Sequence, residues 1–173
     1  MASQTPIQSH LVSSNEKYAS TFTKGDLALP PAKKYAVVTC MDARLDPAAA
    51  YGIDLGDAHI IRNAGGNAQD ALRSLVISEQ LLGTEEILLI KHTGCGMLTF
   101  DNVTAAGLVR QHLGDAGVKE LARFAGDFQT FTDLEAAVRS DVAFLKESPL
   151  IPETVTVSGW VYAVETGKVR KVV

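Results

Sequence analysis

The chain has 173 residues, of which 46% are hydrophobic, and its formal net charge is −4. This length suits one compact domain with its own core, and the scattered Lys and Arg residues form no basic stripe for nucleic acid. No apolar run reaches the roughly 20 residues that span a bilayer, and the first residues lack the blocks of a signal peptide. We therefore expect a protein that binds neither nucleic acid nor membranes.

The N-terminal segment is compatible with a helix over residues 9–22, although its pattern is weak. Pro30 and Pro31 follow, and we expect the helical segment to end there because proline cannot continue a helix. We interpret residues 1–30 as an N-terminal helical arm that precedes an α/β domain at residues 31–173. A frayed terminus would give the same pattern.

Three short aliphatic and β-branched runs, at residues 35–39, 58–62 and 87–91, are typical of strands buried in a parallel sheet. Between the second and third runs, residues 69–82 show helical spacing of apolar side chains and stop at Gly83. This order predicts a βαβ unit with a right-handed crossover. The predicted fold class is α/β, a single domain with a mostly parallel central sheet flanked by helices.

The second half of the chain predicts two helices and a hairpin. Asp101 and Asp133 can each cap a helix, the first running to about residue 113 and the second to about residue 146. A last strand at residues 154–164 is followed by residues 168–173 across a short glycine-containing turn, which favours a β-hairpin.

The only two cysteines, Cys40 and Cys95, each follow a predicted strand. His92 lies three residues before Cys95, so both side chains can reach one ion from a single turn. Cys40 would join them at the carboxyl ends of the strands, where open α/β sheets place their ligands. Two thiolates and one imidazole suit zinc, and three protein ligands leave the fourth position free for catalysis. Two buried structural thiols are the alternative interpretation.

Other site types fit these residues less well. A thioredoxin-like pair needs cysteines separated by two residues, and Gly65-Gly66 follows a strand without the G-x-G-x-x-G pattern of dinucleotide sites. Two cysteines that bind metal leave none for a disulfide, so we expect a reducing, cytoplasmic location.

Five sequence blocks together resemble the β-class carbonic anhydrases in their short form. The blocks are CMDAR at 40–44, IRNAG at 61–65, residues 74–84, HTGCGM at 92–97, and GWVY at 159–162 with Thr166-Gly167. They occur in the order of the family and extend from about residue 35 to residue 173. One departure concerns Gly94, where short members of the family commonly have Asp.

The resemblance implies Cys40, His92 and Cys95 as zinc ligands, with Asp42 and Arg44 as the catalytic dyad. The commonest reaction of the family is reversible hydration of carbon dioxide to bicarbonate by attack of zinc-bound hydroxide on a small linear molecule. A few relatives hydrolyse carbonyl sulfide or carbon disulfide instead. The resemblance also implies a homodimer or dimer of dimers, with N-terminal helices that pack onto the partner.

The residues around the ligands leave alternatives open. Two thiolates cancel the charge of zinc, so activation of water needs help, and Asp42 could orient the nucleophile while Arg44 holds the carboxylate. Asp42 released from Arg44 could instead bind the metal and block it, and the two could also form an ordinary ion pair. His59 and His112 have proton-shuttle chemistry, although a lone His is more often structural. A non-catalytic zinc-binding protein is a further alternative.

Overall fold

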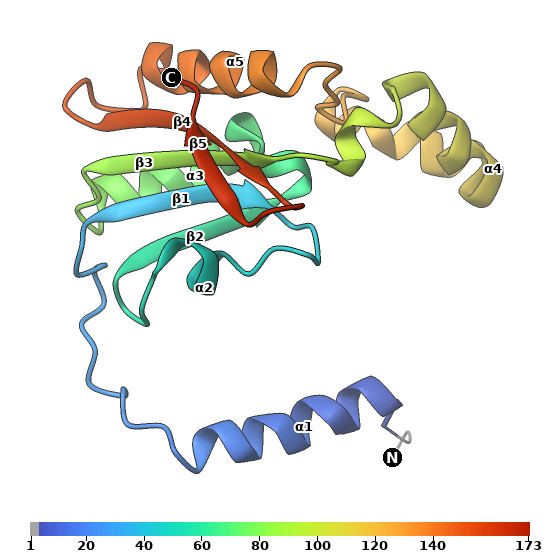
Figure 1. Ribbon diagram of the computed structural model, residues 1–173. Helices are drawn as coiled ribbons and strands as arrows, with labels where there is room; N and C mark the ends of the chain where they lie inside the picture. Colours follow the sequence, from blue (N-terminus) through green and yellow to red (C-terminus); the bar gives the residue numbers. More distant parts are fainter. Residues whose placement is uncertain (1–3) are drawn as a thin grey trace.

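The computed structural model describes residues 4–173 and is organised around one five-stranded sheet in the order β2-β1-β3-β4-β5 (Figure 1). The first four strands in this order are parallel, and β5 pairs antiparallel with β4. The strands are β1 (Tyr35–Cys40), β2 (Ala58–Asn63), β3 (Glu86–His92), β4 (Thr156–Ala163) and β5 (Lys168–Lys171). The predicted α/β fold, the three parallel strands and the C-terminal hairpin are confirmed.

Two helices, α3 (Ala68–Gln80) and α5 (Leu134–Glu147), pack against one face of the sheet and against each other. Aliphatic side chains from these helices and from β1, β3 and β4 form the main core. Burial of this apolar surface is the main stabilising contribution to the fold. On the other face, a smaller apolar cluster gathers around Val37, Ile53 and Ile90, and Tyr51 of α2 (Pro47–Tyr51) packs against it.

Aspartate caps begin two of the helices where the sequence predicted them. Asp101 accepts a hydrogen bond of 2.7 Å from the Thr104 amide at the start of α4 (Asn102–Glu120), and Asp133 caps α5 in the same way. The expected end of the first helix, near residue 113, is instead a kink. Gly114 leaves helical geometry with φ of +69°, and the helical backbone then resumes as far as Glu120.

The N-terminal segment forms helix α1 (Pro6–Ala19), which begins and ends three residues before the predicted range of 9–22. Thr5 starts it through a capping box with Gln8, which was not predicted. The predicted stop at Pro30 and Pro31 was wrong, because the helix ends about ten residues earlier. All of residues 4–30 are exposed, and Figure 1 shows α1 standing apart from the sheet; residues 1–3 of the predicted arm lie outside the described part.

Short 3₁₀ segments follow the strands at the carboxyl edge of the sheet. These are η1 (Ala64–Gly66) after β2 and η2 (Gly96–Leu98) after β3, while η3 (Leu121–Phe124) follows α4. Cys40 ends β1 opposite Asn63 of β2, and His92 ends β3 opposite Tyr162 of β4. The parallel arrangement therefore brings both strand ends to one edge. Among the described helices, none is long and apolar enough for a membrane crossing.

Candidate metal centre

Cys40, His92 and Cys95 meet at this edge of the sheet, as the sequence predicted. Their ligand atoms all lie within 4.8 Å of one another, and all three residues are buried. Cys40 comes from the end of β1 and His92 from the end of β3, while Cys95 lies in the turn before η2. Gly94, with φ of +59°, allows this turn to bring Cys95 back towards His92.

The geometry of the three side chains fits a tetrahedral zinc site. The two Sγ atoms are 3.9 Å apart, and two sulfur ligands at about 2.3 Å from a tetrahedral zinc would be separated by about 3.8 Å. Nε2 of His92 is buried and has no hydrogen-bond partner among residues 4–173. A buried imidazole nitrogen without a partner is costly, and a metal ion beside the two sulfur atoms would satisfy it.

The orientation of His92 is set from behind the ring. Its Nδ1 lies 2.9 Å from the carbonyl oxygen of Thr93, which fixes the ring so that Nε2 faces the sulfur atoms. The Thr93 hydroxyl donates to Glu165 at 2.7 Å and accepts from the Val164 amide at 3.0 Å. The hairpin turn after β4 thus supports the histidine ligand.

The ionisation of the two thiols is strongly linked. The hydrogen bond with Cys95 and, to a smaller extent, the nearby His92 ring lower the pKa of Cys40 to about 4 against the effect of burial, whereas the neighbouring Cys40 and burial raise the pKa of Cys95 well above its usual value. Burial alone lowers the pKa of His92, but the Cys40 thiolate raises the net value. The site therefore already favours one negative sulfur, and a divalent cation would favour the second.

Asp42 and Arg44 form a two-point ion pair directly beside the ligands. Arg44 donates from Nε to Oδ1 of Asp42 at 2.9 Å and from Nη2 to Oδ2 at 2.8 Å, and these bonds hold the pKa of Asp42 well below its usual range. Nη2 also donates to the Gly94 carbonyl at 2.9 Å. Oδ2 of Asp42 lies 3.7 Å from Nε2 of His92, so the carboxylate faces the ligand cluster.

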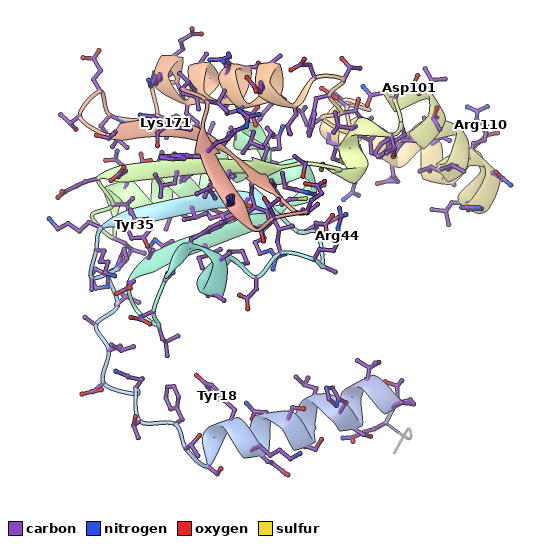
Figure 2. All side chains as sticks on the ribbon, in the orientation of Figure 1. Tyr18, Tyr35, Arg44, Asp101, Arg110 and Lys171 are labelled. Carbon is purple, nitrogen blue, oxygen red and sulfur yellow. The ribbon has the colours of Figure 1, made fainter. Side chains whose placement is uncertain are left out.

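Arg62 is a further member of the site to which sequence reasoning gave no role. Its Nε donates to the Cys40 carbonyl at 3.0 Å and its Nη2 to the Asp42 carbonyl at 2.8 Å. These bonds fix the backbone that presents the side chains of Cys40 and Asp42. Figure 2 shows where the site lies: Arg44 is at one end of the sheet, and Tyr35, the first residue of β1, is at the other end.

The remaining histidines lie elsewhere. His59 is near the start of β2, four residues before Asn63, or roughly 13 Å along the strand, and its Nδ1 contacts the Ser78 hydroxyl at 2.7 Å. His112 is exposed on α4. Neither belongs to the cluster of possible ligands, and the contact of His59 with Ser78, far along β2 from the cluster, favours its structural interpretation. The surroundings of the sulfur atoms are apolar: Leu45, Met97, Leu98, Phe100, Phe131, Tyr162 and Val164.

The fold and the site together define an α/β protein with a Cys–His–Cys site that could hold a metal, at the carboxyl ends of the strands of a mostly parallel sheet. Comparison with known families identifies it further: the sequence profile described as carbonic anhydrase matches residues 35–169. The chain belongs to the carbonic anhydrase family.

Relatives and solved structures agree with this assignment. The chain is 40% identical to beta-carbonic anhydrase 1 of Mycobacterium tuberculosis over 162 residues, which cover 93% of this chain and 94% of the relative. It is 36% identical to a carbon disulfide hydrolase of Acidithiobacillus thiooxidans over 178 residues, covering 95% and 89%. A carbonic anhydrase structure from Glaciozyma antarctica superposes with a TM-score of 0.91 at 47% identity, covering 98% of this chain and 100% of that one.

Proposed function

We propose that this chain is a zinc enzyme that catalyses the reversible hydration of carbon dioxide to bicarbonate. Cys40, His92 and Cys95 would hold the zinc, and Asp42 with Arg44 would form the catalytic dyad. The observation that carries the proposal is the buried Nε2 of His92, which lacks a described partner and shares a cluster with two sulfur atoms at tetrahedral spacing. The names of the mycobacterial relative and of the Glaciozyma structural neighbour point to the same reaction.

The dyad has a clear part in this chemistry. Zinc in such a site supplies Lewis acidity that lowers the pKa of a water molecule. Oδ2 of Asp42 faces the ligand cluster at 3.7 Å from His92 Nε2, where it can accept a hydrogen bond from the attacking water and orient the oxygen towards the substrate carbon. Arg44 keeps the carboxylate ionised and donates to both of its oxygens, so it competes with the metal for Asp42.

We therefore infer an open rather than a self-blocked site. For Asp42 to bind the metal, it would have to give up two charge-assisted hydrogen bonds from Arg44, each among the stronger kinds in proteins. Arg44 is itself held by the Gly94 carbonyl. The apolar side chains around the sulfur atoms suit an uncharged linear substrate better than a charged one.

Hydrolysis of carbonyl sulfide or carbon disulfide is the second candidate. Relatives at 35–38% identity are named carbon disulfide hydrolases, and Gly94 leaves free the space in which a larger residue would stand beside Arg44. A side-by-side assay of the zinc-loaded chain on carbon dioxide, carbonyl sulfide and carbon disulfide decides between them. Turnover of carbon dioxide with the highest kcat/KM supports the main proposal; activity on the sulfur compounds alone supports the second, and binding of zinc without any turnover supports a non-catalytic protein.

We also propose that the chain forms a homodimer or a dimer of dimers, with residues 1–30 as an arm that packs on the partner. Helix α1 exposes large apolar side chains to water: Ile7, Leu11, Val12 and Tyr18, the last of which contacts the ring of Phe22 at 5.4 Å between centroids. The outer strand β2 has a free edge next to an apolar groove of about 380 Å³ between β2 and α3. Covering either surface with a second copy would bury apolar area that is now in water.

We also propose a cytoplasmic location, because a reducing cytoplasm would preserve both free thiols, Cys40 and Cys95.

A further inference from the structure

The side chain of Lys91 is buried one residue before the ligand His92, with 1% of its surface exposed. Its Nζ lies 2.8 Å from Oδ2 of Asp141, 3.0 Å from the Gly65 carbonyl oxygen and 3.2 Å from the Gly66 carbonyl oxygen. An ammonium group has three N–H donors, so all three are used. The charge is thus paired, and two of its three bonds hold the backbone of η1.

The η1 turn lies between the two segments that carry the cysteines. A Cβ added to Gly66 would lie 3.0 Å from the carbonyl carbon of Thr39 and 3.1 Å from the nitrogen of Cys40, and one added to Gly65 would lie 2.9 Å from Cγ of Met97. Both glycines have positive φ, which is +76° for Gly65 and +59° for Gly66. Glycine adopts this conformation without a steric penalty but is also free to leave it, so contacts from outside the turn, such as those of Lys91, can fix its position.

The same turn packs directly against the backbone of Cys40, as the close approach of Gly66 shows. The Lys91 ammonium holds the Gly65 carbonyl, so it also controls where that residue's backbone stands. A buried ion pair alone is weak evidence of a stabilising role, because apolar replacements are often neutral. The two bonds from Lys91 to the Gly65 and Gly66 carbonyls instead indicate that it fixes the position of η1.

We propose that Lys91 is a positioning residue of the metal centre: its ammonium fixes the Gly65-Gly66 turn against Cys40 and so holds the two sulfur ligands at the spacing that zinc requires. This inference rests on the proposed function in one respect, that Cys40, His92 and Cys95 bind the metal. Outer partners of metal ligands are typically worth 10–100-fold in metal affinity. We expect a loss of about that size when the ammonium is removed.

The test compares Lys91→Met, which keeps an unbranched side chain, with Leu145→Ala, which disturbs a fully buried core residue on α5. Zinc affinity is measured by competition with a chelator, and Co²⁺ is used as a probe whose thiolate charge-transfer bands report the sulfur geometry. Lys91→Met should bind zinc about 10–100-fold more weakly and shift the Co²⁺ spectrum. Leu145→Ala should unfold at lower temperature while it keeps the wild-type affinity and spectrum.

Lys91→Gln provides a second variant in case Lys91→Met does not fold. Its neutral amide can still donate to a carbonyl, so we expect a loss of zinc affinity in the same direction but smaller. Wild-type zinc affinity and an unchanged Co²⁺ spectrum in the Lys91 variants would overturn the inference while leaving the proposed function intact. A wild-type chain that fails to bind zinc would instead overturn the proposed function itself.

Discussion

Glu79 is a buried carboxylic acid without hydrogen-bond partners among the described residues, and its replacement by Gln should stabilise the protein in a pH-dependent way. It lies on α3 with 8% of its surface exposed, and neither carboxylate oxygen has a partner among the described residues. Burial raises its pKa from 4.5 to about 7. Because each pKa unit corresponds to about 1.4 kcal/mol, ionised Glu79 lowers the free energy of unfolding by about 3 kcal/mol.

The sign of the effect follows from the raised pKa. Below pH 4.5 the carboxyl is protonated in both the folded and the unfolded chain, and the wild type and Glu79→Gln should be equally stable. As the pH rises from 4.5 to about 7, the unfolded chain releases the proton first and the wild type loses stability. Above pH 7 the difference should stay constant.

Urea unfolding of the wild type and of Glu79→Gln at pH 5 and pH 8.5, at one fixed protein concentration, measures this difference. We expect Glu79→Gln to gain less than about 1 kcal/mol at pH 5 and about 3 kcal/mol at pH 8.5. Glu153→Gln, at an exposed position, is the matched control and should change stability by no more than about 0.5 kcal/mol at either pH. An equal gain at both pH values would show that ionisation of Glu79 is not the cause.

Three predictions concern the site and the assembly. Asp42→Ala and Arg44→Ala should keep their zinc but hydrate carbon dioxide about 10²–10⁴-fold more slowly, and near-wild-type rates with full metal would mean that the dyad is only structural. Gly94→Asp should favour carbon dioxide over carbonyl sulfide by at least about fivefold, or about 1 kcal/mol, because its Cβ would stand 3.9 Å from Nη1 of Arg44; an unchanged ratio of kcat/KM values would remove position 94 from substrate selection. Deletion of residues 1–24 should weaken self-association in light scattering, and a stable, active full-length monomer would contradict the proposed arm.

Much of the fold was predictable because its signals are local. The buried strands are continuous aliphatic runs, and the caps at Asp101 and Asp133 precede their helices directly. The clustering of the three candidate ligands was predictable for a related reason: Cys40 and His92 end adjacent parallel strands, so topology alone brings them together. The bounds of the N-terminal helix were three residues off, because the capping box of Thr5 and Gln8 that starts it is a weaker signal than the aspartate caps and the proline pair lies beyond its end at Ala19.

The supporting contacts were not predictable, because they join residues far apart in the chain. Thr93 and Glu165 are 72 residues apart, and their hydrogen bond exists only once β3 and β4 are paired. Lys91 looks like an ordinary strand residue in the sequence, and its burial against Asp141 depends on how α5 packs over β3. His59 carries suitable chemistry for proton transfer, but its position in β2 places it towards the opposite edge of the sheet.

The proposed function depends above all on one zinc ion per chain, held by Cys40, His92 and Cys95 with a fourth position open. X-ray absorption at the zinc K-edge, together with metal analysis of the wild type and of Cys40→Ser, measures this arrangement. We expect one zinc per chain, two sulfur neighbours at about 2.3 Å and nitrogen or oxygen neighbours at about 2.0–2.1 Å, and loss of most of the zinc in Cys40→Ser. A zinc shell without two sulfur neighbours, or a Cys40→Ser variant that keeps its full zinc and activity, would show that the ligand assignment is wrong.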